Sequence, residues 1–291
     1  MNLISTLALL ASCFWLGTPG AACVQDKAAT QLVAIGPQFT GNSIDVAISA
    51  DAYIVWDVKT GKVLKEKAAN EKRPVASLSK LATVLLVQDV LSPGQTVEIP
   101  QEAARAQRLG ANIKLPVGEH AYVKDLLAAS LIPSANDAAV TLAAAAKGSE
   151  EDFVKFANTE LPRLGFANTK LGNATGLQGG DQYSTAQDIK GLLMHAYKDP
   201  VTGPLLAQGK GSLTTVEGKT REYVTTNKLL GTYLPVLAAK TGYTTQAKEN
   251  LALVTRGAQG QELGVVLLGS DDRFQNMKVL VEWIWRNYTW L

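Results

Sequence analysis

The chain has 291 residues, of which 46% are hydrophobic and 19% are charged, and its formal net charge is +2. This length can bury a sizeable core in one large domain or two small ones, and the composition is ordinary for a soluble globular protein. The small net charge, with lysines and arginines scattered and no basic run, argues against a nucleic-acid partner.

Cysteine and histidine are too scarce for the sites that they commonly build. Cys13 and Cys23 are the only cysteines, so a disulfide framework or a cysteine metal site is excluded after residue 23. His120 and His195 stand alone, outside any distinctive motif, so neither a His-rich metal site nor a Ser-His-Asp triad is expected. Both histidines are expected to be surface or helix-packing residues.

Residues 1–22 have the pattern of an export signal. The apolar run over 3–16 is too short for a comfortable membrane span, and small residues at 20–22 offer a cleavage site. No lysine or arginine precedes the apolar run, which leaves open a true start upstream. Two stretches that end in cysteine, 10–13 and 20–23, resemble lipid-attachment sites imperfectly, so lipidation also stays open.

The first strands are predicted after a loose lead-in segment over residues 23–44. Residues 44–49 and 52–57 have the composition of strands. A turn over 57–62 and a return strand over 63–67 complete a β-hairpin.

A buried helix is predicted over residues 73–90, and it opens with a serine and a lysine three positions apart. Pro74 suits the first turn of a helix, and the apolar residues that follow fall on every face. Ser77 and Lys80 therefore share one face of this helix. In a dry setting the amine can be held neutral and can take the proton of the hydroxyl. Alone, however, this pattern is more often a solvated helix start.

The middle of the chain is predicted to be mainly helical. Pro133 ends one helix, and Ser134-Ala135-Asn136-Asp137 leads into an alanine-rich helix. The predicted elements are turns and short pieces over 93–121, helices over 123–131, 138–146, 150–164 and 185–197, and a loop over 168–183.

From about residue 210 the pattern changes to the period of two that is typical of strands. The predictions are a hairpin over 212–217 and 220–226, strands over 236–241, 249–255 and 263–268, and a final aromatic-rich helix over 274–290. We expect that helix to pack on the sheet rather than on a membrane surface. Strands at both chain ends with helices between them predict an α+β fold, with one sheet built from both termini.

Three short motifs stand in an order that indicates a serine acyltransfer site. Ser77-x-x-Lys80 opens the buried helix, Ser134-Ala135-Asn136 precedes another helix, and Lys240-Thr241-Gly242 ends a strand. Penicillin-binding proteins and β-lactamases carry these motifs in this order. Each has a plainer interpretation alone: Ser134 and Asn136 as helix caps, and Lys240 as a solvated strand end.

The chain resembles the serine D-alanyl-D-alanine carboxypeptidases of bacterial cell walls, which are the low-molecular-mass penicillin-binding proteins. The resemblance covers roughly residues 45–285 and extends beyond the motifs to 132–139, 173–177, 182–188, 226–230 and 240–244. It implies a DD-peptidase/β-lactamase-like fold with an antiparallel sheet, a helical subdomain and a catalytic domain over 45–291. It implies no metal and no cofactor.

The resemblance also implies a catalytic role for four residues. Ser77 would be the nucleophile toward the carbonyl of the penultimate D-alanine, and Lys80 its base. Ser134 would relay a proton to the leaving D-alanine amine. Asn136 would bind a peptide carbonyl of the substrate and anchor Lys80.

The implied substrate-binding residues are Lys240, Thr241, Gly242, Tyr243 and Arg273. Lys240 and Thr241 suit a free carboxylate, and Lys240 would also keep Lys80 deprotonated by charge repulsion. The backbone N–H groups of Tyr243 and the nucleophile would form the oxyanion hole. Tyr243 stands where histidine is frequent, and since the hole uses its backbone, we expect no loss of chemistry. Arg273 is a second carboxylate anchor by its position in the family.

We therefore predict an enzyme that removes the terminal D-alanine from peptidoglycan stem peptides through an acyl-enzyme on Ser77, inhibited by β-lactams. It would act in the periplasm or at the extracytoplasmic face of the cell envelope. Membrane contact would come only through an uncleaved signal or a lipidated N-terminus.

Three alternatives stay open. The first is an endopeptidase that cuts peptidoglycan cross-links with the same residues, and the second is a β-lactamase. Class A β-lactamases need a Glu-x-x-x-Asn pattern, but four positions after Glu160 stands Leu164, so slow deacylation is predicted. The third is a non-catalytic peptidoglycan-binding protein, against which the intact motifs argue.

Overall fold

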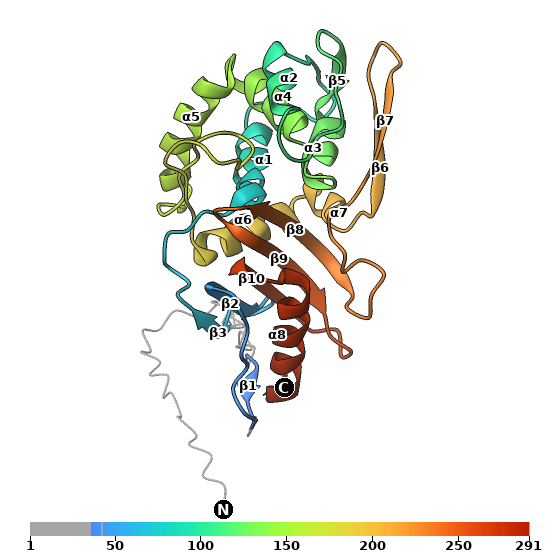
Figure 1. Cartoon of the computed structure of the whole chain (residues 1–291). Coiled ribbons are helices and arrows are strands. Elements are labelled where there is room, and N and C mark those ends of the chain that lie inside the picture. The colour runs from blue at the N-terminus through green and yellow to red at the C-terminus, as the bar shows by residue number, and fades with distance from the viewer. Residues whose placement is uncertain (1–35, 42, 291) are drawn as a thin grey trace, which may run out of the picture. The chain divides into compact units, whose positions relative to one another are not determined.

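A computed structural model describes residues 36–41 and 43–290 of the chain (Figure 1). The predicted export signal, both cysteines and most of the predicted lead-in segment lie outside the described residues. Among the helices that are described, none is long and apolar enough to cross a membrane.

Five antiparallel strands form the central sheet, in the order β3-β2-β10-β9-β8. They are β2 (Ala52–Asp57), β3 (Val63–Lys67), β8 (Val236–Thr244), β9 (Lys248–Arg256) and β10 (Glu262–Ser270). Strand β2 lies between β3 and β10, with Trp56 opposite Gly264. The predicted sheet built from both chain ends is therefore confirmed.

Both faces of this sheet are covered, which explains why the central strands β2 and β10 are buried along their whole length or nearly so. Alternate side chains of a strand point to opposite faces. Trp56 belongs to the core shared with α6 (Ala186–Lys198), whereas Val55 belongs to the core shared with α8 (Arg273–Asn287). Figure 1 shows α8 against one face of the sheet. The aromatic-rich helix thus packs on the sheet, as expected.

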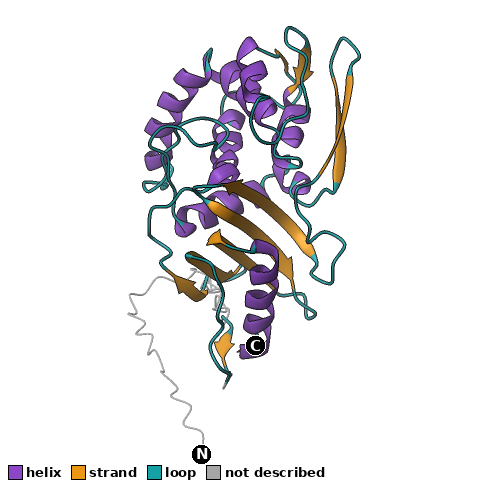
Figure 2. Cartoon of the chain, in the orientation of Figure 1, coloured by secondary structure: helices purple, strands orange, loops and turns teal. Residues whose placement is uncertain are grey.

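The helices of the middle of the chain gather beside the sheet (Figure 2). They are α1 (Lys80–Gln88), α2 (Gln101–Ala106), α3 (Val123–Leu131), α4 (Asn136–Lys147), α5 (Glu150–Arg163) and α7 (Thr202–Leu205). Helix α3 has the predicted bounds, because Pro133 ends it as expected. Thr185 caps α6 by accepting a hydrogen bond from the backbone N–H of Asp188.

Three two-stranded sheets complete the described fold. They pair β1 (Gln38–Phe39) with β11 (Tyr288–Thr289), β4 (Thr96–Glu98) with β5 (His120–Tyr122), and β6 (Lys210–Thr214) with β7 (Thr220–Val224). The last pair is the predicted hairpin, and it is separate from the central sheet.

The predicted strand over 44–49 is wrong. Both edges of β2, the next strand along the chain, are taken by β3 and β10, so this segment cannot pair with it. Val46 and Ile48 instead pack against the core under α8. The described part of the lead-in segment contains β1, which the sequence did not indicate, because its partner β11 lies at the other end of the chain.

Candidate active site

Ser77 lies in a tight 3-10 turn, η1 (Ala76–Ser79), directly before α1. The helix begins at Lys80 and not near Pro74, so that part of the prediction is wrong. Ala76 has a φ of 48°, a left-handed conformation that costs a non-glycine residue about 1–2 kcal/mol. Residues three apart eclipse in a 3-10 turn, and Lys80 Nζ lies 2.9 Å from Ser77 Oγ.

Lys80 is fully buried and has two further polar neighbours. Its Nζ lies 2.7 Å from Asn136 Oδ1 and 2.8 Å from the backbone oxygen of Thr175. Burial lowers the pKa of Lys80 well below its usual range, and the nearby charge of Lys240 lowers this pKa further, against the opposing effect of Asp137. The site therefore favours the neutral amine, which is the form that can accept a proton.

Ser134 and Asn136 point into the same site from the start of α4. The N-cap of α4 is Ala135, and no side chain makes a capping bond, so the interpretation of these residues as helix caps is wrong. Ser134 has a φ of 64°, and its Oγ accepts a hydrogen bond of 2.7 Å from Lys240 Nζ. Asn136 Nδ2 donates to the backbone oxygen of Leu109 at 2.9 Å, which leaves Oδ1 for Lys80.

Lys240 lies on β8 and is only 1% exposed, so it is not a solvated strand end. Burial lowers its pKa from 10.5 to about 7, and the charge of Arg273 contributes in the same direction. Its ammonium is held by Ser134 Oγ and by the backbone oxygen of Thr241 at 3.1 Å. Near neutral pH this side chain can therefore change its charge with small changes in its surroundings.

Gly242 lets β8 pass directly against the turn that carries Ser77. A Cβ atom at this position would lie 2.8 Å from the backbone oxygen of Val75 and 3.1 Å from the backbone nitrogen of Ser77. A larger residue would push the strand away from the nucleophile. The next residue, Tyr243, has a side chain that is 61% exposed.

Arg273, at the start of α8, reaches the same strand. Its Nη1 donates to the backbone oxygen of Gly242 at 2.9 Å, and its Nε is buried without a hydrogen bond. The guanidinium therefore has a free donor beside the Lys240-Thr241-Gly242 motif. The structure thus brings together all nine residues that the sequence singled out: Ser77, Lys80, Ser134, Asn136, Lys240, Thr241, Gly242, Tyr243 and Arg273.

One further group in the site was missed by the sequence reasoning. The backbone oxygen of Thr175 lies 2.8 Å from Lys80 Nζ and 3.4 Å from Ser77 Oγ. A Cβ at Gly176 would lie 2.1 Å from the backbone oxygen of Ala76, so this loop is pressed against the nucleophile turn. In the sequence, the stretch 173–177 contributes only to the resemblance to the family. A backbone carbonyl has no residue signature, which is why no role was predicted for it.

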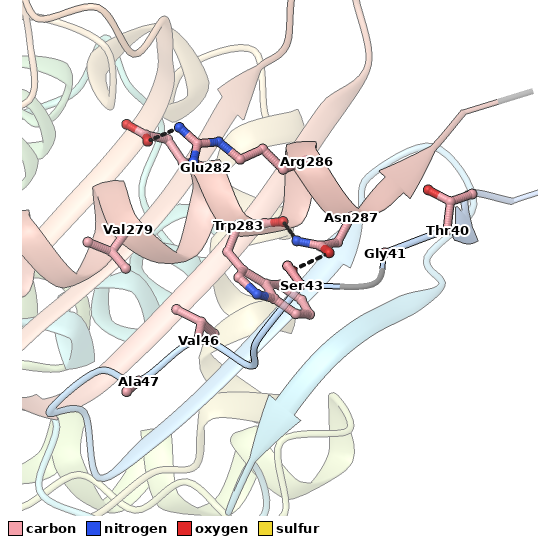
Figure 3. A pocket seen from close by; sticks show the side chains of 10 residues that line it. All are labelled: Thr40, Gly41, Ser43, Val46, Ala47, Val279, Glu282, Trp283, Arg286 and Asn287. Carbon is pink, nitrogen blue, oxygen red and sulfur yellow. Dashed lines mark hydrogen bonds and ion pairs between the residues drawn. The ribbon is translucent and has the colours of Figure 1, made fainter.

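A small polar cavity of about 110 Å³ borders this site, lined by residues 74–76, 176, 178–182, 244 and 246. A second pocket, drawn in Figure 3, lies between α8 and residues 40–41 and 43–47, with Trp283 and Asn287 facing Ser43. Its lining residues include none of the nine site residues.

The two histidines lie outside this cluster. His120 Nδ1 is 2.9 Å from a carboxylate oxygen of Glu217, and His195 packs edge-on against Phe166. Within the described part of the chain, no group of three or more histidine, cysteine, aspartate and glutamate side chains could hold a metal ion.

Comparison with known proteins gives one consistent result. A family model described as D-alanyl-D-alanine carboxypeptidase, peptidase S11, matches residues 38–272. The D-alanyl-D-alanine carboxypeptidase DacF of Bacillus subtilis is 32% identical over 238 residues, which are 81% of this chain and 61% of that protein. A D-alanyl-D-alanine endopeptidase of Pseudomonas aeruginosa is 31% identical over 173 residues, 60% of this chain and 56% of that protein. The chain therefore spans about three fifths of the length of these relatives.

A solved structure has the same fold. The crystal structure of a D-alanyl-D-alanine carboxypeptidase from Mycobacterium tuberculosis H37Rv superposes with a TM-score of 0.77 at 26% identity. The match covers 85% of this chain and 95% of that chain. The predicted DD-peptidase-like α+β fold is thus confirmed.

Proposed function

This chain belongs to the D-alanyl-D-alanine carboxypeptidase family of serine peptidases, and from that premise we propose that it removes the terminal D-alanine from peptidoglycan stem peptides. The observation that carries the proposal is the buried amine of Lys80, 2.9 Å from the hydroxyl of Ser77. Burial lowers the pKa of that amine and so favours its neutral form, and a neutral amine in contact with a hydroxyl is an activated nucleophile pair.

The first step of the proposed reaction forms an acyl-enzyme. Ser77 Oγ attacks the carbonyl carbon of the penultimate D-alanine while its proton passes to Lys80 Nζ. The N–H groups of Ser77 and Tyr243 stabilise the oxyanion, which the close approach of Gly242 to the Ser77 nitrogen supports. The C–N bond then breaks, and the leaving D-alanine amine takes a proton through Ser134. Water later hydrolyses the ester.

The terminal carboxylate of the substrate is bound by Lys240, Thr241 and Arg273. A bound carboxylate favours the charged form of Lys240, whose pKa of about 7 in the free protein leaves it readily protonated. The free Nε donor of Arg273 supports its role as a second anchor. Since β-lactams carry a carboxylate next to a reactive amide, they acylate Ser77 and inhibit the enzyme.

The catalytic domain in this proposal covers residues 45–291, and the enzyme works on the extracytoplasmic side of the membrane, where its substrate lies. An endopeptidase is the second candidate, because a relative with that name is 31% identical to this chain. The two activities differ in the leaving group, which is D-alanine in one case and a cross-linking peptide in the other.

A labelling and cleavage experiment tests the proposal. The protein is incubated with a fluorescent penicillin and, separately, with a pentapeptide that ends in D-Ala-D-Ala, with Ser77→Ala as the control. We expect one covalent label per chain and release of D-alanine from the wild type, and neither from the variant.

Other outcomes would overturn the proposal in distinct ways. No label and no released D-alanine would exclude a serine peptidase. Rapid turnover of the penicillin would instead indicate a β-lactamase. Labelling together with cleavage of cross-linked dimers, but not of the pentapeptide, would indicate the endopeptidase.

A further inference from the structure

We propose that Asn173 is a positioning residue for the reaction of Ser77. Its side-chain amide holds the backbone carbonyl of Thr175 against Lys80 and thereby directs the lone pair of the amine toward the serine hydroxyl. This inference rests on the proposed function, because it concerns the activation of the same nucleophile.

Asn173 organises the loop from inside through four hydrogen bonds. Its Oδ1 accepts from the backbone N–H of Thr175 at 3.1 Å, from the Thr175 hydroxyl at 2.8 Å and from the backbone N–H of Gly176 at 2.8 Å. Its Nδ2 donates to the backbone oxygen of Leu177 at 2.9 Å. The peptide group between residues 175 and 176 therefore has its N–H bound by Asn173, while its carbonyl, on the opposite side, faces Lys80.

The direction of the Thr175 carbonyl matters because it decides which neighbour faces the lone pair of the Lys80 amine. A neutral lysine has two N–H donors and one lone pair. Lys80 Nζ has three polar neighbours: Asn136 Oδ1 at 2.7 Å, the Thr175 oxygen at 2.8 Å and Ser77 Oγ at 2.9 Å. The two carbonyl oxygens can only accept, so they take both N–H groups. The lone pair is left for the hydroxyl of Ser77, as proton abstraction requires.

The loop is also fastened to its surroundings, but at the neighbouring residue Ala174. Thr83 Oγ1, on α1, donates to the backbone oxygen of Ala174 at 2.9 Å, and the half-buried carboxylate of Glu150 accepts from its N–H at 2.9 Å. These contacts fix where the loop lies. They hold the peptide group before Thr175, whereas Asn173 binds the N–H of the peptide group after it.

Removal of the Asn173 side chain should change both the rate of acylation of Ser77 and the pH dependence of that rate. Without Asn173 the Thr175 carbonyl turns away, and misplacing one reacting group by about 1 Å can cost a factor of about 100 in rate. The ammonium form of Lys80 also loses an acceptor, so the pKa of Lys80 falls. The charged groups that act on Lys80, which are Lys240 on β8 and Asp137 on α4, stay in place.

Asn158, on α5, offers a matched control because its side chain holds the same loop at another place. It is half-buried like Asn173, and its side chain exchanges two hydrogen bonds of 2.8 Å with the backbone of Leu171. It is not in contact with the peptide group that faces Lys80. Its removal should loosen the loop without changing the direction of the Thr175 carbonyl.

The test measures the rate of acylation by a fluorescent penicillin across pH for the wild type, Asn173→Ala and Asn158→Ala. In Asn173→Ala we expect the maximal acylation rate, the plateau of the pH profile, to be about 10- to 100-fold lower than in the wild type. We also expect the acid limb, where the rate rises with pH as Lys80 loses its proton, to move to lower pH. In Asn158→Ala we expect the wild-type acid limb. A profile of Asn173→Ala that matches Asn158→Ala, or a lower plateau with an unmoved limb, would overturn the inference.

Asn173→Asp keeps the proposal testable if the alanine variant does not fold. Aspartate retains the accepting oxygen, so the plateau should stay close to that of the wild type. Its negative charge near Lys80 should move the acid limb to higher pH, opposite to alanine. A plateau as low as that of Asn173→Ala would count against the inference. If the wild type itself takes no label, the proposed function fails instead.

Discussion

At the scale of single residues, two buried lysines set the behaviour of the site. Lys80 and Lys240 are 0% and 1% exposed, and burial is the main cause of the lowered pKa of each. Each amine is surrounded by oxygen atoms rather than by a carboxylate at salt-bridge distance. Two buried ammonium groups without a carboxylate partner lower the stability of the fold. The two lysines therefore serve the chemistry of the site rather than the stability of the protein.

The pKa of Lys240 predicts that stability rises with pH. Between about pH 7 and 10.5 the unfolded chain binds a proton at residue 240 that the folded chain does not. The free energy of unfolding therefore rises across this window, by up to about 1.4 kcal/mol per pH unit for one proton. Urea unfolding at several pH values measures this rise, and Lys240→Met should lose a large part of it.

The control for this experiment is an exposed lysine. Lys228→Met removes one charge from the surface, where the folded and unfolded environments are similar. The Lys228→Met variant should show the same increase of the free energy of unfolding with pH as the wild type. An equally steep rise in wild type and Lys240→Met would show that Lys240 is not desolvated in the folded protein.

At the scale of elements, the site depends on the close contact between the turn η1 and the loop over residues 173–177. Two residues in or beside this site, Ala76 and Ser134, hold left-handed backbone conformations without being glycine. Such strain persists only where surrounding contacts impose it. Here the contacts come from the loop at Gly176 and from β8 at Gly242, which both pass within van der Waals distance of η1.

Two glycines with similar left-handed backbone conformations allow the effect of this contact to be distinguished from the effect of backbone strain. Gly176 and Gly165 have φ values of +80° and +91°, but only Gly176 has neighbours that a Cβ would strike. Gly165→Ala should cost about 1–2 kcal/mol of stability from backbone strain alone, and Gly176→Ala should cost more because its Cβ also clashes with Ala76, both measured by urea unfolding. Gly176→Ala should in addition slow acylation of Ser77 more than 10-fold, about the cost of a small displacement.

The comparison of the two variants decides whether the contact matters. If Gly176→Ala is acylated as fast as Gly165→Ala, the loop does not hold the nucleophile turn in place. If both are slow, the loss follows from general destabilisation and not from the contact with Ala76.

At the scale of the whole molecule, the pairing of β2 with β10 joins the two ends of the described chain. Trp56 is 1% exposed and stands opposite Gly264, where a Cβ would lie 2.1 Å from the indole ring. The glycine therefore makes room for the largest side chain of the core. This single cross-strand pair links a strand before the helices to one after them.

A double-mutant cycle tests that link. Gly264→Ala should destabilise the protein by about 1–3 kcal/mol, because it overpacks the core against Trp56. In a Trp56→Leu background the same change should cost much less, since the indole is gone. Urea unfolding of all four proteins gives the coupling energy. Additive effects would mean that the two residues do not meet across the sheet.

The sequence by itself determined the features that depend on local chemistry. Pro133 predicted the end of α3, and strand-type composition and a period of two predicted all five strands of the central sheet, with β8 three residues short, together with the β6–β7 hairpin. The three motifs identified the family, because their residue types and order are written directly in the chain. They contain seven of the nine residues that the structure gathers into one site, and the family resemblance added Tyr243 and Arg273.

Only the tertiary structure decided the features that depend on distant neighbours. The strand predicted over 44–49 did not form because β3 and β10 already occupy both edges of β2. The helix predicted from Pro74 begins at Lys80 because the loop at Gly176 and the strand at Gly242 press the preceding residues into a 3-10 turn. The lowered pKa of Lys80 depends on burial by elements far along the chain, and the Thr175 carbonyl that contacts it belongs to the backbone, which carries no residue-type signal.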